Sequence, residues 1–524
     1  MRSAWPFSLA RAIGVAAALI LVVLASHGCG SRGGDGGGSG ARPRLLVIGL
    51  DGASWSVIEP WIGAGHLPNI ARLRERGVWG DLASVTPPLS APAWTTAVTG
   101  VNPGQHGVLN FVLVDPADYS QRMATARDRR VPAIWEYLTR EGKTSGIVNI
   151  PLTSPADSLN GFMIGGFPHL DTTGIYFPHD LAAGIERAAG PILFDDYGEQ
   201  LPPGREIEEL DRLLRTIESK RAVSHHLMTT RDWDLFWVVF LASDKVHHFY
   251  WQYNDSLHPA YDANAPARLQ GAMLEVWIAL DRAVGELVAA AGKNATVLIL
   301  SDHGSGPVRR EFRLLNWLAR EGYAHPDLRE SRVLAFQPYG GDIYIHDARF
   351  ANGIVADSMR APLVDEIVGK LEAIRDPEAS GDVLAPIHRR QEVYRGPAAA
   401  GAPDILFEGA PGWLVSRGKG NPAAPLFGPP AYTFSGYHLP DGILLATGPG
   451  VAAPGRIEGA RLIDITPTLL YFLNCDIPKA IEGSVLSALV PPERFAAAPP
   501  RIVDVEIERA TEETEAIRAI PYIR

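Results

Sequence analysis

This chain of 524 residues has few cysteines, and it has no net positive charge. Its two cysteines, Cys29 and Cys475, cannot build the disulfide framework of a small secreted scaffold. The net charge of −11 offers no overall basic surface, so we expect no nucleic-acid partner. With 46% hydrophobic and 20% charged residues, the composition is that of a globular protein and excludes an intrinsically disordered one.

No hydrophobic run near the N-terminus has the full length of a transmembrane helix. The run AIGVAAALILVVLA at 12–25 is short for a membrane span, but it has the length of the apolar core of a signal peptide. Cys29 follows it and opens a Gly/Ser-rich segment that is typical of a flexible linker. The pattern resembles a bacterial lipoprotein signal.

From this pattern we predict a signal peptide over residues 1–28 and a linker over 29–43 that starts at a lipidated Cys29. The expected location is the bacterial cell envelope, with the protein anchored to a membrane as a lipoprotein. Ordinary cleavage nearby, which would give a periplasmic or secreted protein, and an uncleaved anchor remain alternatives. The other cysteine, Cys475, lies in an apolar run and is expected in the core.

Short apolar runs alternate with amphipathic stretches from residue 44 onward, which indicates an α/β fold. We expect a mostly parallel central sheet that is flanked by helices on both faces. The strongest strand candidates are 45–50, 144–150, 234–244 and 295–304, and the helix candidates are 67–77, 131–142, 205–231 and 267–292.

The regular alternation of strand and helix candidates is interrupted over residues 306–435. Here Pro/Gly-rich loops separate helix candidates at 312–323 and 356–375 and a strand candidate at 341–347. This interruption of the α/β pattern predicts an inserted subdomain. The α/β pattern returns at 441–451 and 464–474, so the main domain is expected to span 44–490. Residues 491–524 are expected to form a peripheral tail.

Aspartates follow three of the apolar runs, at Asp51, Asp244 and Asp302. Each alone is more often a turn or cap residue, but open α/β sheets build their sites at the carboxyl ends of their strands. His303 directly follows Asp302, and His248 follows Asp244 at the spacing of one helical turn. These neighbours favour a metal site.

Nitrogen and oxygen ligands in this mixture suit zinc, with manganese as the second choice. We expect Asp244, His248 and His438 to hold one divalent ion, where His438 precedes a further strand candidate. The second ion is assigned to Asp51, Asp302, His303 and the Ser90 oxygen. Two ions about 4 Å apart favour an in-line displacement at phosphorus.

Ser90 stands in the stretch TPPLSAPAWTTAVTG, directly before a helix-like segment. A serine there is more often a helix cap, but it can also act as a nucleophile because a helix N-terminus stabilises negative charge. The metal-ligand candidates elsewhere in the chain favour the nucleophile.

These motifs resemble the alkaline phosphatase superfamily and, within it, the type I phosphodiesterase/nucleotide pyrophosphatase branch. The resemblance covers about residues 44–475. It implies an alkaline-phosphatase-like fold and two metal ions in the same grouping as above. Its motifs are VIGLDG at 47–52, TG-x-x-P-x-x-HG at 99–107, D-x-x-x-H at 244–248, SDHG at 301–304, and His438.

Two positions depart from related families. Nucleotide pyrophosphatases carry an asparagine where this chain has Ala93, so we expect phosphate contacts from the helix start at Ala93 and from Lys245. Trp94 occupies the place of the sulfatase arginine, which disfavours a formylglycine sulfatase. In the aromatic run HHFYWQY, Trp251 is a candidate substrate wall, although such a run is more often core.

The expected function is therefore hydrolysis of small-molecule or lipid-head-group phosphate esters, more often diesters, through a covalent phosphoserine at Ser90. One alternative is a phosphotransferase or phosphomutase that uses the same residues. The other is a metal-stabilised envelope protein without turnover, and the complete ligand set argues against it.

Overall fold

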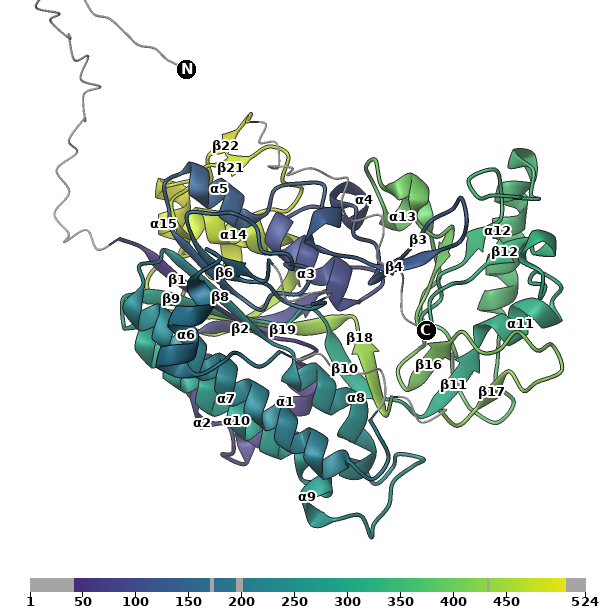
Figure 1. Cartoon of the computed structure of the whole chain (residues 1–524), viewed down its shortest axis with the longest axis horizontal. Helices are drawn as coiled ribbons and strands as arrows, with labels where there is room; N and C mark the ends of the chain where they lie inside the picture. Colours follow the sequence, from purple (N-terminus) through teal and green to yellow (C-terminus); the bar gives the residue numbers. More distant parts are fainter. Residues whose placement is uncertain (1–41, 170–173, 195–200, 431–433, 506–524) are drawn as a thin grey trace, which may run out of the picture. The chain divides into compact units, whose positions relative to one another are not determined.

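The computed structural model describes residues 42–169, 174–194, 201–430 and 434–505. The expected signal peptide, Cys29, all but the end of the linker and the final part of the expected tail lie outside these residues. A nine-stranded sheet forms the centre of the described chain (Figure 1). Its strands are, in spatial order, β20 (Gly455–Arg461), β2 (Val78–Ala83), β19 (Asp441–Thr447), β9 (Ala295–Leu300), β1 (Arg44–Leu50), β8 (Leu235–Phe240), β5 (Ser145–Val148), β6 (Gly161–Ile164) and β7 (Tyr176–Phe177).

The pairing in this sheet is mostly parallel, as predicted. Strand β1 pairs in parallel with β8 and β9, and β5 pairs in parallel with β8 and β6. The exceptions are β19, which runs antiparallel to β2 and β9, and the edge strand β7. The expected α/β class is confirmed.

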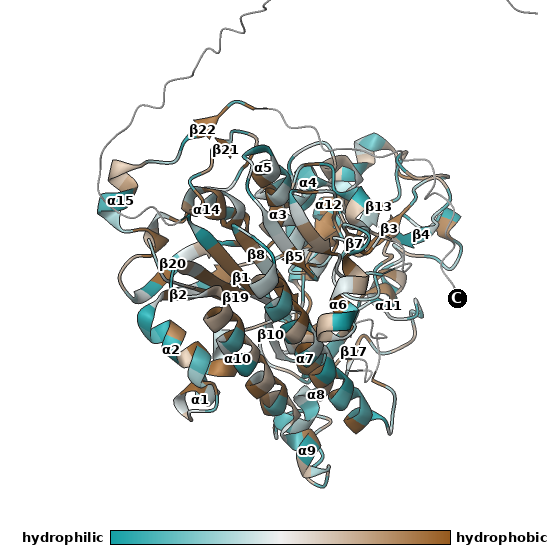
Figure 2. Cartoon of the chain, turned by 60° about the vertical axis from the view of Figure 1, so that its left-hand side comes forward, coloured by the Kyte–Doolittle hydropathy of each residue, from teal (hydrophilic) through white to brown (hydrophobic). Residues whose placement is uncertain are grey.

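Alternate residues of β1 face two separate cores, because side chains in a strand point to opposite faces. Leu46 and Ile48 belong to one core, and Leu45 and Val47 belong to the other. The first core is completed by α7 (Glu206–Thr230) and α10 (Ala272–Ala291), and the second by α3 (Ser90–Thr99), α5 (Ile134–Arg140) and α14 (Ile465–Phe472). Figure 2 shows hydrophobic colour along the central strands, which these helices cover.

Residues 310–428 contain a further hydrophobic core of their own. It is built around the three-stranded sheet of β11 (Arg310–Arg313), β16 (Trp413–Ser416) and β17 (Phe427–Gly428), with helices α11 (Leu314–Arg320) and α12 (Asp357–Glu372). This separate core supports our interpretation of the region as an inserted subdomain. The hairpin of β3 (Val112–Val114) and β4 (Gln121–Met123) reaches it, and Tyr119 at the hairpin tip hydrogen-bonds the His346 ring at 2.8 Å.

The remaining elements connect or border these layers. The helices are α1 (Trp55–Gly63), α2 (Pro68–Arg76), α4 (Pro103–His106), α6 (Leu181–Ala189), α8 (Ala242–Asn254), α9 (Ala267–Gln270), α13 (Arg390–Val393) and α15 (Pro492–Ala497). The strands are β10 (Gly304–Pro307), β12 (Val333–Leu334), β13 (Tyr344–Ile345), β14 (His388–Arg389), β15 (Ile405–Leu406), β18 (Gly436–Leu439), β21 (Ile477–Pro478) and β22 (Ile502–Val503).

Three details bear on the sequence predictions. The strand expected at 234–244 ends at Phe240, so Asp244 lies in the first turn of α8 rather than at a strand end. Cys475 is buried, as expected of a core residue. Within the described ranges, no helix combines the length and the apolar character that crossing a membrane requires.

Candidate metal centre

Adjacent parallel strands place two of the aspartates at the same edge of the sheet. Asp51 follows β1 and Asp302 follows β9, and in this pair Gly49 lies opposite Leu300. Gly52 makes the turn after Asp51 with a φ of +65°, and its N–H donates to Asp302 Oδ1 at 3.3 Å. A Cβ at Gly52 would lie 2.9 Å from Asp244 Oδ1, so the absence of a side chain lets the third aspartate approach.

Two short strands bring the last histidine to this edge. The antiparallel pair of β10 and β18 sets Ser305 opposite His438. Because β10 begins directly after His303, residues far apart in the sequence become neighbours, and the ring centroids of His303 and His438 are 3.8 Å apart.

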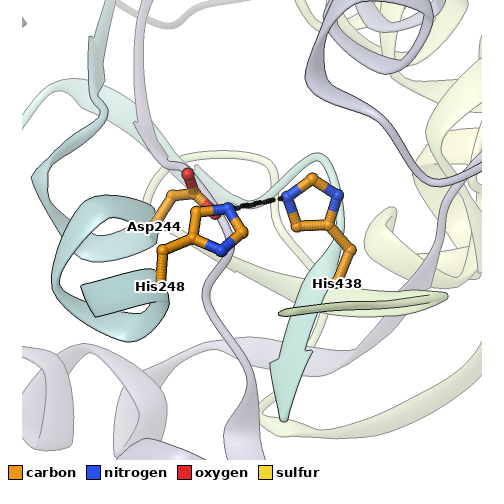
Figure 3. A group of neighbouring side chains, drawn as sticks. All are labelled: Asp244, His248 and His438. Atoms are coloured by element: carbon orange, nitrogen blue, oxygen red, sulfur yellow. Dashed lines mark hydrogen bonds and ion pairs between the residues drawn. The ribbon is translucent and has the colours of Figure 1, made fainter. Parts of the chain in front are cut away.

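Asp244, His248 and His438 converge on one point, as Figure 3 shows. His248 Nε2 lies 3.2 Å from Asp244 Oδ1 and 3.1 Å from His438 Nε2. His438 Nε2 lies 3.6 Å from the same carboxylate oxygen. The other nitrogen of His248, Nδ1, is hydrogen-bonded to the backbone oxygen of Gly436 at 2.8 Å, which fixes the ring with Nε2 toward the group. These three side chains could hold a metal ion.

A second group adjoins the first. Atoms of Asp51, Asp244 and His303 lie within 4.8 Å of one another, and Asp302 Oδ2 is 3.3 Å from His303 Nε2. Asp244 thus belongs to both groups, whereas the sequence analysis assigned it to one ion alone. The carboxylate of Asp244 thus contributes an oxygen to each group.

Ser90 is the first residue of α3, and the N-cap position is Leu89. The cap interpretation of Ser90 is therefore wrong. Its Oγ lies 3.2 Å from His303 Nε2 and 3.4 Å from Asp51 Oδ1, and its side chain is buried among these groups.

The charges of this site are not balanced by the protein. Asp51, Asp244 and Asp302 are 1%, 6% and 0% exposed, and no lysine or arginine of the described ranges forms an ion pair with them. Asp244 Oδ1, Asp302 Oδ2 and His438 Nδ1 are buried without a hydrogen-bond partner. Uncompensated buried carboxylates cost several kcal/mol each, so oxygens and nitrogens that converge in this way fit divalent cations.

Burial and the closeness of the three aspartates shift the pKa of each carboxyl group. Burial, and then the charges of Asp302 and Asp244, raise the pKa of Asp51 well above its usual value. Burial and the Asp244 charge raise the pKa of Asp302 to about 8. Burial also opposes ionisation of Asp244, but the imidazoles of His248 and His438 outweigh it and hold the pKa of Asp244 well below its usual value. Without added positive charge, the three carboxyl groups cannot all ionise together.

Two tryptophans, which the sequence analysis did not include among the site residues, fix the loops that carry the ligands. The indole N–H of Trp94 donates to Asp51 Oδ2 at 2.7 Å, which leaves Oδ1 toward Ser90. The indole of Trp277 donates to His247 Nε2 at 3.0 Å, so His247 carries its proton on Nδ1 and donates to the Gly52 oxygen at 3.1 Å. His247 therefore has a structural role, because both of its ring nitrogens are held by hydrogen bonds.

A cavity of about 210 Å³ opens over Ser90, and we call it the catalytic cavity. Lys245, one of the predicted substrate contacts, lines it. Ala93, whose predicted contact is through the backbone at the helix start, is fully buried, and Trp251 is 8% exposed; neither is among the lining residues.

Most of the cavity wall is apolar and was not predicted from the sequence. Its side chains include Phe111, Met123, Phe167, Tyr339, Phe434 and Tyr437. Asn110 adds a polar group, and its Nδ2 donates to the buried Asp342 Oδ2 at 3.1 Å. A lone asparagine and scattered aromatics in loops give no periodic signal that could have identified them.

Comparisons with known proteins agree with this geometry. A family model described as type I phosphodiesterase/nucleotide pyrophosphatase matches residues 45–441. No curated protein sequence matches the chain significantly.

Solved structures show the same fold at low sequence identity. Human ectonucleotide pyrophosphatase/phosphodiesterase 5 is 17% identical with a TM-score of 0.51, covering 85% of this chain and 99% of its own. The murine protein is 15% identical with a TM-score of 0.51, covering 86% of this chain and 100% of its own. Phosphonoacetate hydrolase from Sinorhizobium meliloti, in complex with phosphonoformate, is 16% identical with a TM-score of 0.52, covering 83% of this chain and 96% of its own.

The family model spans more than half of the chain, and it includes all the metal-ligand candidates together with Ser90. The chain therefore belongs to the type I phosphodiesterase/nucleotide pyrophosphatase family of phosphoester hydrolases, within the alkaline phosphatase superfamily.

Proposed function

We propose that this protein is an exported two-metal hydrolase of phosphate diesters that works through a covalent phosphoserine at Ser90. The observation that carries the proposal is the buried convergence of three carboxylates and three imidazoles beside the Ser90 hydroxyl, where no lysine or arginine of the described residues pairs with the carboxylates. Among the murine structures is an inactive variant in complex with AMP. A phosphate ester is accordingly the substrate class to test first.

Each ligand has a proposed place. Asp244, His248 and His438 would hold one ion, and Asp51, Asp302, His303 and the Ser90 oxygen would hold the other, with Asp244 close to both. The mixed nitrogen and oxygen donors favour zinc, and manganese is the second choice. Bound there, two divalent ions would supply positive charge for the developing negative charge at phosphorus.

The chain's own residues account for the bond changes. Ser90 Oγ would attack phosphorus, the bond between phosphorus and one ester oxygen would break, and the released alcohol would take up the serine proton. Water would then attack the Ser90 phosphoester, which releases the phosphate monoester and restores the hydroxyl. Lys245 lines the same cavity and would bind a phosphoryl oxygen.

The apolar leader and the position of Cys29 support export and lipidation. We propose that Cys29 tethers the enzyme to a membrane of the cell envelope, where the Gly/Ser-rich linker would let the catalytic domain reach soluble esters or lipid head groups.

An activity screen on the metal-reconstituted protein tests the proposal. Matched aryl phosphate diesters, aryl phosphates, phosphonate esters and sulfate esters are compared at one pH with zinc and then with manganese. We expect the diester to show the highest kcat/KM. A tenfold preference for the monoester, equal to about 1.4 kcal/mol in barrier, would reverse the diester assignment. If a protein with full metal occupancy turns over none of these esters, the proposal that it is a phosphoester hydrolase is wrong.

A further inference from the structure

The catalytic cavity does not end at the metal site. It shares Val112, Pro338 and Tyr339 with a second cavity of about 620 Å³, which we call the side cavity. The shared residues come from β3 and from the loop before β13. The two cavities therefore adjoin each other across these three residues.

A glycine-rich loop presents two cations to the side cavity. The loop reads RGKGN over residues 417–421, and Arg417 and Lys419 both line the cavity. Neither forms an ion pair with a carboxylate of the described chain, and Arg417 Nη1 donates only to the backbone oxygen of Phe336, at 3.2 Å. The third cation of the cavity, Arg313, is already paired with Glu311 at 2.9 Å.

This loop is held in shape by its surroundings. Gly418 and Gly420 have φ values of +71° and +70°, a conformation that favours glycine. The side-chain oxygen of Asn316, a residue only 2% exposed, accepts hydrogen bonds from the backbone N–H groups of Lys419 and Asn421 at 3.2 and 3.1 Å. The two cations are thus carried by a fixed loop and not by a loose surface segment.

A third cavity also borders Val112, but its charges are mixed. Its cations, which include Arg127 and Arg130, share the space with Asp115, Asp118 and Asp128. That cavity consequently offers no excess of positive charge comparable with the side cavity.

We propose that the side cavity is a subsite for a second anionic group of the substrate. The preferred substrate would then be a phosphate diester in which one ester group carries a phosphate or carboxylate, separated from the scissile phosphorus by an apolar linker. The anion binds Arg417 and Lys419, and the linker lies against Val112, Pro338 and Tyr339. This inference rests on the proposed function of the catalytic cavity.

The test uses three nitrophenyl alkyl phosphate diesters that differ only at the end of the alkyl chain, which carries a phosphate, a carboxylate or a hydroxyl. The measured quantity is the ratio of kcat/KM for each anionic substrate to that for the hydroxyl substrate. We expect a ratio of about ten or more in the wild type, and a tenfold lower ratio in the double variant Arg417→Gln/Lys419→Gln. A higher ratio for phosphate than for carboxylate would identify a phosphate subsite, and equal ratios would identify a general anion subsite.

The matched control is Arg231→Gln/Lys293→Gln, which removes two exposed cations that precede β8 and β9 at the opposite edge of the sheet. The control should keep the wild-type ratio. Equal ratios in the wild type and in Arg417→Gln/Lys419→Gln would overturn the subsite.

A binding measurement separates the subsite from the proposed function. Calorimetry with the Ser90→Ala protein and the phosphate-ended diester requires no turnover. We expect a tenfold weaker Kd when Arg417→Gln/Lys419→Gln is added. If no diester is turned over by the wild type but this difference in Kd is found, the hydrolase assignment fails and the anion subsite remains. An unchanged Kd overturns the subsite.

Discussion

Replacing Ser90 by alanine separates chemistry from folding in this protein. The serine Oγ lies 3.2 Å from His303 Nε2 and 3.4 Å from Asp51 Oδ1, and both distances are long for hydrogen bonds. Leu89 and not Ser90 is the N-cap of α3, so no capping energy is lost. Loss of one such interaction costs about 0.5–1.5 kcal/mol. The Tm should therefore fall by no more than about 5 °C.

Turnover should respond quite differently. A covalent nucleophile cannot be replaced by a methyl group, so kcat for an aryl phosphate diester should fall by about a thousandfold or more, which is about 4 kcal/mol of barrier. Metal content should stay close to that of the wild type, because Asp51, Asp302 and His303 remain. The wild type, quenched in acid during turnover, should yield a Ser90 peptide that carries the phosphoryl group.

Thr99→Val is the matched control for Ser90→Ala. Thr99 is a buried hydroxyl on the same helix, and it donates to the Thr95 oxygen at 2.7 Å, away from the ligands. It should lose stability without a comparable loss of kcat. If Ser90→Ala keeps near wild-type kcat with full metal content, the serine is not the nucleophile and the two-step path is wrong.

Two further substitutions and one measurement on the unchanged protein test other predictions. His438→Ala should lower the metal content by about one ion per chain and recover activity partly at high zinc; an unchanged metal content would remove His438 from the ligands. Burial raises the pKa of Asp342 to about 7 from 3.8, so the protonated form is favoured in the folded state and unfolding free energy should fall as pH rises through about 4 to 7. Asp342→Asn should reduce that slope by up to about 1.4 kcal/mol per pH unit, and identical chemical-denaturation profiles for the two proteins would contradict it. Mass spectrometry of the mature N-terminus should find an acylated Cys29, and a mature chain that begins elsewhere would exclude the lipid anchor.

Most of the candidate metal ligands could be grouped from the sequence because they lie in strong local patterns. Asp51 and Asp302 follow buried strands, and Asp244 and His248 have helical spacing. The sharing of Asp244 between two groups could not be predicted, because it depends on how closely α8 approaches the turn at Gly52. The packing of a helix against a distant turn produces no recognisable pattern in the sequence around Asp244.

Trp251 shows how a neighbouring strand can reverse a local prediction. Asp244, His248 and Trp251 share one face of α8, since their spacing is four and then three residues. A wall position for Trp251 was therefore reasonable. Gly436 of β18 lies over this ring, and a Cβ there would be 2.7 Å from Trp251 Cε3, so the ring is covered by backbone. No feature of residues 247–253 reveals which strand will cover them.

The proposed preference for a diester over a monoester depends on the charge of the site. Ser90 stands at the start of α3, whose N-terminus supplies about half a positive charge, far less than the three buried carboxylates remove. Two divalent ions would exceed the three carboxylates by one positive charge, if the imidazoles are neutral. A phosphate diester carries one negative charge and would balance that excess, whereas a monoester dianion would leave a negative charge in a buried site. Lys245 also lines the cavity, and its charge would raise the excess to two positive charges, which a monoester dianion balances. The proposed preference for diesters therefore depends on whether Lys245 contacts the phosphoryl group, and Lys245→Met should shift the ratio of kcat/KM further toward the diester if it does.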